Sequence, residues 1–283
     1  MLKGTQVEAE LKSGVFIRAK VIGDGPPLLL LHGVPGSGSV WDEVADRLAP
    51  DFQVIVPDLL GFGDSDRGHG PGLLSDPQAT AVHQLLTTLR IQRPAVVGHD
   101  FGGPVALTME RLFPGTVGKL VLSATNTFPD TPIPFPLSSI FLPVVGSLAR
   151  KGIFSRPSLA MMIKQGVGNG GPALDPQKYL GDHDQSRAIA TIFSHSLMNI
   201  RNVYTPVENT LRGLNIPIQV IWGTEDPFFP LAHGERTAEA AGVDLVVYNG
   251  AGHFIPEERP AEFARDIASF VAAPERAHRS EVS

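Results

Sequence analysis

Short apolar runs alternate with helical patterns over most of the chain. The run Leu28–Leu31 is apolar at every position, as expected for a strand that is buried on both faces of a parallel sheet. Strands that alternate with helices in this way predict an α/β fold with a mostly parallel sheet. The predicted strands are Val15–Ile22, Leu28–Leu31, Val54–Val56, Ala95–Val97, Leu120–Leu122, Ile218–Ile221 and Leu245–Tyr248, and the predicted helices are Val40–Leu48, Pro77–Leu89, Gly103–Phe113 and Leu231–Ala241.

The alternation of strands and helices stops after Ser123. From about residue 129 to about residue 211 the pattern is helical, and this stretch opens with a run rich in proline. Strand character resumes only at Ile216. We therefore predict a helical cap, residues 129–211, inserted into a core domain that consists of residues 1–128 and 212–283.

The main candidate for chemistry lies between a predicted strand and the helix that follows it. The segment reads Val96-Val97-Gly98-His99-Asp100-Phe101-Gly102-Gly103. It has the form of a nucleophile elbow, in which glycines flank the nucleophile because the turn brings backbone close to backbone. The first turn of the following helix favours a negative charge at this point. Asp100 is therefore the candidate nucleophile.

Four other motifs lie before and after the elbow in the chain. Leu31-His32-Gly33-Val34-Pro35 follows a predicted strand, Trp222–Pro227 and Gly250–Phe254 follow the last two strands, and Asp58–Ser65 reads as a structural turn. Together with the elbow, these motifs resemble the α/β-hydrolase superfamily over nearly the whole chain. Most of that superfamily has serine at the elbow. The aspartate makes the pattern most similar to that of epoxide hydrolases and, after them, haloalkane dehalogenases.

The resemblance implies a role for each motif. His253 is expected to act as the general base that deprotonates water, and Asp226 as the acid that orients its imidazole. The backbone N–H groups of Val34 and Phe101 are expected to form the oxyanion hole. An alternative is a non-catalytic, ligand-binding relative that has kept the fold; the complete set of Asp100, His253 and Asp226 argues against it.

An aspartate at the elbow restricts the chemistry. A serine that attacked a saturated carbon would form an ether that the enzyme could not cleave. A carboxylate forms an ester, and water can attack its carbonyl carbon and release an alcohol. The substrates implied are therefore epoxides or alkyl halides. A related outcome is a cyclised product, if another group of the substrate traps the opened ring.

Two positions argue against an alkyl halide. Haloalkane dehalogenases hold the leaving halide with side-chain N–H donors after the nucleophile and after the His-Gly pair. Here these positions are Phe101 and Val34, which have no such donor. Trp41 and Trp222 lie in core-domain motifs, where packing is the expected role. Hydrolysis of an epoxide to a vicinal diol is therefore the predicted function, with dehalogenation as the alternative.

Epoxide hydrolases also need an acid in the cap, normally two tyrosines. The cap contains only Tyr179 and Tyr204, and the predicted helix Gln185–Val203 carries His195 near the usual place of the second tyrosine. His195 is either the proton donor or an exposed polar residue. The further candidates for contact with the substrate are His32, for which a structural role is favoured, and Pro35.

The cap is rich in large apolar side chains, and flexible methionines suit irregular ligands. We therefore expect a lipophilic small-molecule substrate. The residues concerned are Phe128, Phe135, Phe141, Phe154, Met161, Met162 and Phe193.

The composition of the chain argues against several other classes of protein. The chain has 283 residues, 42% of them hydrophobic, with a formal net charge of −6 and no cysteine. The absence of a basic run argues against a nucleic-acid partner, and the absence of cysteine excludes disulfides and thiolate chemistry. No apolar run reaches the ~18 residues that span a bilayer, and the first residues do not have the layout of a signal peptide. We expect a cytoplasmic protein without membrane contact, cofactor or metal; whether it forms a homodimer stays open.

Overall fold

The computed structural model describes residues 4–67, 70–132, 156–180 and 183–274. Its eight strands form one sheet in the order β1-β2-β4-β3-β5-β6-β7-β8. The pairs β1–β2 and β2–β4 are antiparallel, and all other pairs are parallel. This arrangement confirms the predicted α/β class. The strands are β1 Thr5–Glu10, β2 Phe16–Ile22, β3 Pro27–Leu31, β4 Gln53–Asp58, β5 Ala95–His99, β6 Lys119–Ser123, β7 Ile218–Gly223 and β8 Leu245–Tyr248.

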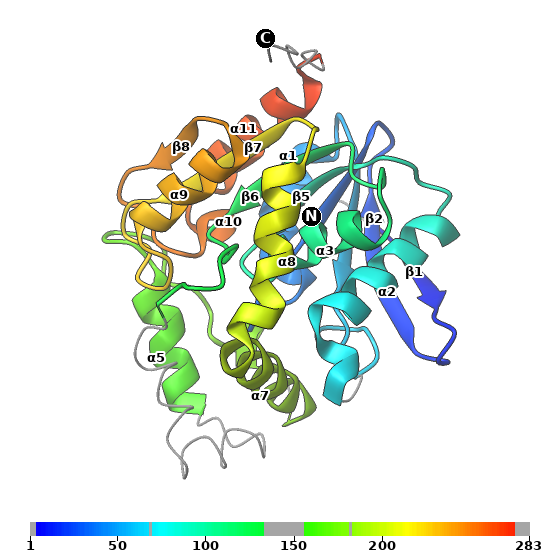
Figure 1. Ribbon diagram of the computed structural model, residues 1–283, viewed down its shortest axis with the longest axis horizontal. Coiled ribbons are helices and arrows are strands. Elements are labelled where there is room, and N and C mark those ends of the chain that lie inside the picture. Colours follow the sequence, from blue (N-terminus) through cyan, green and yellow to red (C-terminus); the bar gives the residue numbers. More distant parts are fainter. Residues whose placement is uncertain (1–3, 68–69, 133–155, 181–182, 275–283) are drawn as a thin grey trace.

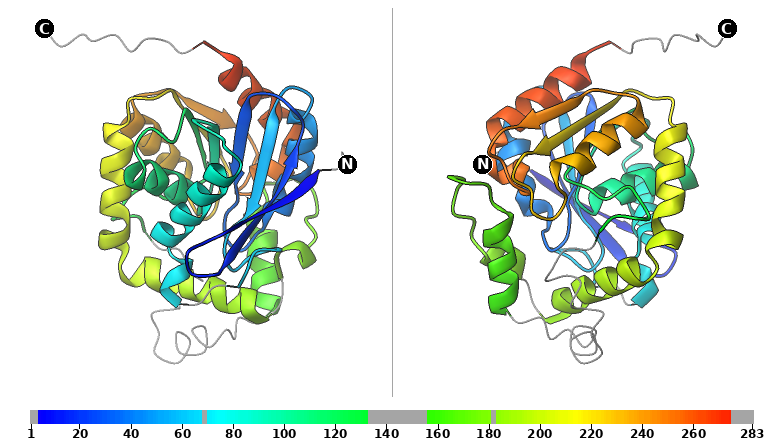
Figure 2. Two further views of the ribbon diagram at one scale, coloured as in Figure 1. Left: turned by 90° about the vertical axis from the view of Figure 1, so that its right-hand side faces the viewer. Right: turned by 60° about the vertical axis from the view of Figure 1, so that its left-hand side comes forward.

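Helices cover both faces of the sheet (Figure 2). Helices α1 and α11 pack together on one face, where the rings of Trp41 and Phe263 stack with their centroids 6.1 Å apart. Helices α2, α3, α8 and α9 pack in sequence along the other face. The helices of these layers are α1 Asp42–Leu48, α2 Ser75–Thr88, α3 Gly102–Leu112, α8 Ile200–Gly213, α9 Leu231–Ala241, α10 Ile255–Glu258 and α11 Pro260–Ala272, and short 3-10 helices occupy Gly38–Trp41 and Gly70–Leu73.

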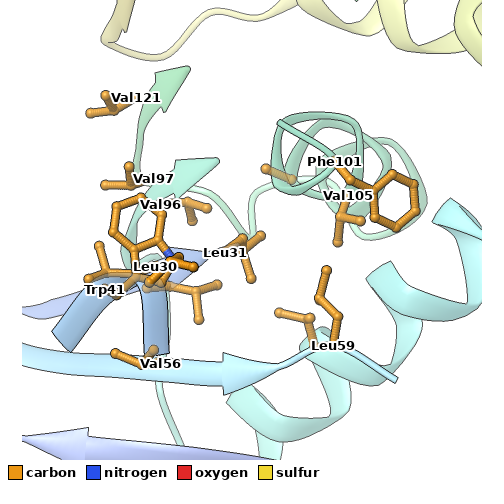
Figure 3. Packing of buried hydrophobic residues seen from close by; sticks show 14 of the residues in the cluster. Leu30, Leu31, Trp41, Val56, Leu59, Val96, Val97, Phe101, Val105 and Val121 are labelled. Carbon is orange, nitrogen blue, oxygen red and sulfur yellow. The ribbon is translucent and has the colours of Figure 1, made fainter. Parts of the chain in front are cut away.

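The core consists mainly of aliphatic side chains from the central strands. All four leucines of Leu28–Leu31 are fully buried, as a strand covered on both faces requires. Figure 3 shows leucine and valine side chains of β3, β4, β5 and β6 gathered around Trp41. Because this region is packed from both sides, it fixes the ends of the central strands and the loops that follow them.

The parallel register brings distant segments to one edge of the sheet. Leu31 pairs with Gly98, Ser123 pairs with His99 and with Ile221, and Gly223 pairs with Tyr248. The strands β3, β5, β6, β7 and β8 therefore end at the same edge, which is where ligands bind in open α/β sheets. The loops that follow them carry Val34, Asp100, Asn126, Asp226 and His253.

Between β6 and β7, helices are the only regular secondary structure among the described residues. These are α5 Arg156–Gly166, α6 Gln177–Leu180, α7 His183–Met198 and α8. Figures 1 and 2 show α5 and α7 beyond one edge of the sheet. The division into a 129–211 cap and a core stays a prediction, since the proline-rich stretch falls largely on residues 133–155. Phe135, Phe141 and Phe154 also lie outside the described residues.

The observed elements differ from the expected ones in three places. The predicted helical run Gln185–Val203 is helical except at Asn199, which leaves helical geometry (φ −123°, ψ 29°) and separates α7 from α8. Strand β1 is not predicted from the sequence, because it is a polar edge strand with only Ala9 buried. The short α10 and the longer α11 are not predicted either; α11 follows the last strand and packs on α1.

Candidate active site

Asp100 occupies the tight turn between β5 and α3. Its backbone φ is +50°, in the left-handed region that a residue other than glycine rarely adopts. The flanking glycines are needed for close approach: a Cβ on Gly98 would lie 2.7 Å from the Cα of Gly103, and one on Gly102 would lie 2.3 Å from the Leu31 carbonyl oxygen. This strained turn holds the Asp100 side chain above the edge of the sheet.

One oxygen of Asp100 lies among backbone N–H groups. The Val34 N–H donates to Asp100 Oδ1 at 2.7 Å, and the Phe101 N–H also stabilises the carboxylate. Gly33 passes so near that a Cβ there would lie 2.3 Å from the Asp100 Cβ. The structure thus brings together both N–H groups that were predicted to form an oxyanion hole.

His32 is bonded to the backbone of the loop that carries Gly33 and Val34, and its ring nitrogens do not face Asp100. Its Nε2 accepts the Leu59 N–H at 2.9 Å, so Nδ1 carries the proton and donates to the Gly33 carbonyl at 2.8 Å. Burial lowers the pKa of His32, which keeps the ring neutral. Both ring nitrogens are occupied by backbone groups, so His32 is structural and is not a contact or proton donor for a substrate.

His253 and Asp226 form a hydrogen-bonded pair beside Asp100. His253 Nδ1 lies 2.9 Å from Asp226 Oδ2, and His253 Nε2 lies 3.7 Å from Asp100 Oδ2. The other oxygen of Asp226 accepts the N–H groups of Phe228 and Phe229 at 2.8 and 2.9 Å. These bonds fix Asp226, which orients the imidazole with Nε2 directed to Asp100.

Burial and neighbouring charges set the protonation of the triad. Burial raises the pKa of Asp100, while His253 and the two N–H groups oppose this rise. Burial alone would lower the pKa of His253, but Asp226, through its charge and hydrogen bond, and Asp100 raise that pKa overall. The two carboxylates therefore stabilise the imidazolium that forms when His253 takes a proton.

The loop that carries His253 is bonded to α5 and to the residues that follow it. The His253 N–H donates to the Gly166 carbonyl, at the end of α5, at 2.6 Å. Glu258 accepts the N–H groups of Gly168, Gly252 and Phe254, each at 2.9 Å. The position of the histidine is thus fixed jointly by the core and by α5.

Two apolar lobes meet at Asp100. The larger has a volume of about 70 Å³ and the smaller about 60 Å³. Both are lined by Val34, Asp100, Phe193, Phe228 and Phe229. The larger lobe also includes Phe101, Asn126, Thr131, Ile192, Ser196 and Tyr204, and the smaller includes Pro35, Leu159, Met162, Ile163 and His253.

The structure separates the three predicted proton donors. The buried Tyr204 lines the larger lobe with Asp100, whose charge contributes to a raised pKa of the phenol after burial, the main cause. His195 is exposed and lines a different groove, beside Asp76 and Arg111. The structure therefore does not bring His195 to Asp100.

Tyr179 reaches the site from another side. Its side chain lines a small cavity of about 10 Å³ together with Asp100 and His253. The hydroxyl donates to the carboxylate of Glu257, which also lies 3.4 Å from Lys178 Nζ. Burial raises the pKa of Glu257 to about 7, with Lys178 acting in the opposite direction.

The remaining predicted residues occupy varied positions. Pro35 lines the smaller lobe, and its carbonyl accepts a hydrogen bond from Gln185 Nε2 on α7 at 3.1 Å. Phe193 and Met162 line the cavity, but Met161 is exposed and Phe128 packs under Arg236. Sequence reasoning did not single out Asn126 or Glu257. Asn126 follows β6 at the ligand-binding edge of the sheet, which was the available signal for it.

Within the described residues, no helix is long and apolar enough to cross a membrane. No three acidic or histidine side chains in this part of the chain gather as ligands for a metal ion.

The fold and this geometry define a class of hydrolase. The chain belongs to the alpha/beta hydrolase family, whose model matches residues 28–266. An uncharacterised protein of Mycobacterium tuberculosis is 29% identical over 276 residues, which cover 93% of this chain and 80% of that protein. A soluble epoxide hydrolase of Corynebacterium sp. is 29% identical over 269 residues, which cover 90% of this chain and 92% of that enzyme.

A solved structure has the same fold. It is an alpha/beta hydrolase fold protein from Burkholderia ambifaria, similar to this chain with a TM-score of 0.80 and 24% identity. The match covers 93% of this chain and 97% of that structure. At this identity the likeness concerns the fold alone.

Proposed function

We propose that this chain hydrolyses epoxides to vicinal diols through a covalent ester on Asp100. The observation that carries the proposal is a carboxylate at the elbow, with Oδ1 bound by the Val34 N–H and Oδ2 3.7 Å from His253 Nε2. A carboxylate in this position can attack a saturated carbon and form an ester. Water can cleave that ester, so the enzyme is regenerated.

In the first step, Oδ2 of Asp100 attacks one carbon of the epoxide and the carbon–oxygen bond of the ring breaks. The electron pair of that bond passes to the epoxide oxygen, which needs a proton. Tyr204 is the donor we assign, because it is the phenol that lines the larger lobe with Asp100, whereas the hydroxyl of Tyr179 is bonded to Glu257. The products of this step are a hydroxyalkyl ester of Asp100 and a tyrosinate.

In the second step, His253 takes a proton from water and the hydroxide attacks the carbonyl carbon of the Asp100 ester. Negative charge develops on Oδ1, which already accepts the Val34 N–H, and the Phe101 N–H also stabilises this carboxylate. Collapse of the intermediate breaks the carbon–oxygen bond to the substrate, and the departing oxygen takes the proton of the newly added hydroxyl, which releases the diol and restores the carboxylate. The proton on His253 balances the one that Tyr204 gave, so the net reaction consumes one epoxide and one water.

Two observations favour an epoxide over an alkyl halide. Trp222 Nε1 donates to the Phe229 carbonyl at 2.7 Å, and Trp41 packs against Phe263, so neither indole is directed to Asp100. The side chains of Val34 and Phe101 supply no donor for a halide. The Corynebacterium relative, named as a soluble epoxide hydrolase, supports the same choice.

The cavity supports a lipophilic substrate. Its two lobes are mainly apolar and meet at Asp100, so a reactive carbon at their junction can carry an apolar group on each side. We therefore propose an epoxide with at least one bulky hydrocarbon substituent.

The proposal is tested by trapping the ester. In the variant His253→Gln the first step should proceed and the second should stop. The variant is incubated with styrene oxide, 1,2-epoxyoctane, trans-stilbene oxide or 1-bromohexane, and its intact mass is measured. Asp100→Asn, in the same His253→Gln background, is the matched control.

An increase by the mass of a whole epoxide, absent from the Asp100→Asn control, is the expected result. An increase by hexyl minus hydrogen, without any epoxide adduct, would instead indicate a dehalogenase. If no compound adds while the same compounds raise the melting temperature, the chain is a ligand-binding relative and the proposed function is wrong.

A further inference from the structure

Asn126 lines the larger lobe together with Asp100 and the proposed proton donor, Tyr204. It follows β6 and is buried. Its side chain lies within hydrogen-bonding reach of the Tyr204 hydroxyl, as does that of Ser196. The mechanism derived above leaves Asn126 without a role.

The surrounding loop fixes which end of the Asn126 amide faces which neighbour. The Phe128 N–H lies 3.0 Å from Oδ1, and because a backbone N–H can only donate, the atom facing it must be the oxygen. The Thr131 hydroxyl donates to the same oxygen at 2.6 Å. The amide nitrogen, Nδ2, is therefore the group that remains for Tyr204.

A donor in this place decides where the Tyr204 proton goes. When Nδ2 donates to the phenol oxygen, the hydroxyl hydrogen cannot be directed at Asn126 and is available to a substrate in the lobe. After the proton has been transferred, the same N–H stabilises the tyrosinate. Accordingly, hydrogen bonds from Asn126 and Ser196 act against the burial that raises the pKa of Tyr204.

The loop that carries Asn126 is held by the core. Arg236 on α9 forms an ion pair with Asp130 at 2.7 Å, and its guanidinium lies 3.8 Å from the centre of the Phe128 ring. The hydroxyls of Thr127 and Thr237 lie 3.2 Å apart. Asn126 therefore presents a fixed donor to a tyrosine on α8.

We infer that Asn126 is a positioning residue, which aligns the Tyr204 hydroxyl for proton donation and stabilises the tyrosinate that results. The inference rests on the proposed function, since it concerns the opening of an epoxide ring. With Asn126 holding its hydroxyl, the single phenol of Tyr204 can serve as the acid where epoxide hydrolases normally use two tyrosines.

The substitution Asn126→Asp tests this with little change in shape. An aspartate keeps an oxygen for the Phe128 N–H and the Thr131 hydroxyl, but it replaces the donor to Tyr204 with an acceptor of like charge to the tyrosinate. Asn126→Ser is a second variant, in which the hydroxyl can still accept the Phe128 N–H but cannot reach Tyr204. Asn202→Asp, on an exposed position of α8, controls for the added charge.

Each substitution is made in the His253→Gln background, and the rate of ester formation is measured in a single turnover with the fastest epoxide of the panel. We expect Asn126→Asp and Asn126→Ser to slow ester formation by roughly tenfold to a hundredfold, the range of an impaired general acid. Asn202→Asp should leave the rate within about twofold of the parent. Melting temperatures of all variants show whether they are folded.

The decisive measurement repeats Asn126→Asp and Asn126→Ser with Tyr204→Phe also present. If Asn126 acts through Tyr204, the two substitutions add less than about threefold to the effect of Tyr204→Phe, because the shared step is already lost. An unchanged rate in the parent, or full slowing without the phenol, would overturn the inference. Failure of His253→Gln itself to form an ester with any epoxide would overturn the proposed function instead.

Discussion

Two adjacent glutamates, Glu257 and Glu258, should respond in opposite ways when each is replaced by glutamine. Glu257 is largely buried, and burial raises its pKa from 4.5 to about 7. The folded protein therefore prefers the neutral carboxyl, whereas the unfolded chain ionises near the ordinary value. The folded state is consequently destabilised above pH 4.5, and this penalty is complete once the pH exceeds about 7.

The size of the effect follows from the pKa difference. One pKa unit corresponds to ~1.4 kcal/mol, so a change from 4.5 to about 7 corresponds to about 3 kcal/mol at pH 8. At pH 5 the same calculation leaves less than about 1 kcal/mol. A glutamine stays neutral, keeps an acceptor for the Tyr179 hydroxyl and loses only the partly exposed pair with Lys178.

Thermal unfolding between pH 5 and pH 9 at constant ionic strength measures this. Glu257→Gln should raise the melting temperature by roughly 5–10 °C at pH 8 and by much less at pH 5, at ~2–4 °C per kcal/mol. Glu258→Gln should lower it at every pH, because Glu258 accepts three backbone N–H groups and each bond to a charged acceptor contributes ~1.5–3 kcal/mol. A gain for Glu257→Gln that is equal at pH 5 and pH 8, or a loss at pH 8, would refute the reasoning.

Three further predictions concern activity. Asp226→Asn should lower kcat by ~10³–10⁴, because the Phe228 and Phe229 N–H groups hold Oδ1 and turn the amide nitrogen toward His253 Nδ1, which forces the wrong tautomer; a kcat within tenfold of the parent would contradict this. Gly33→Ala should abolish ester formation, as its Cβ would lie 2.3 Å from that of Asp100, while circular dichroism should show an intact fold. Met162→Trp should fill the smaller lobe, so the KM for trans-stilbene oxide should rise at least about tenfold and that for styrene oxide less than about threefold; equal changes would argue against two separate lobes.

The parts of the fold and site that were predictable are those encoded locally. The continuous apolar run of β3 and the glycines around Asp100 indicate a buried strand and a tight turn before any contact is known. The same holds for the loops after β7 and β8, because parallel strands must end at a common edge. Strand β1 could not be predicted in this way, since Val7 and Ala9 are its only apolar residues and are too few to give a pattern.

The choice among proton donors depends on tertiary packing. His195 and Tyr204 are nine residues apart, and in a continuous helix they would point in opposite directions. The sequence therefore implies that only one of them can face Asp100, but it does not contain which side of α7 and α8 meets the core. The bond between Tyr179 and Glu257 joins residues 78 positions apart, and no local pattern indicates it.

The bonds that join Gly166 and Gly168 of the cap to the loop of His253 have a consequence for protein engineering. A cap transplanted from a relative would bring its own peptide groups to the point where His253 and Glu258 are anchored. Chimeras that exchange the whole insertion are therefore expected to misplace His253, unless residues 166–168 and 250–258 are taken from the same parent protein. The natural unit for recombination in this chain crosses the predicted boundary between cap and core.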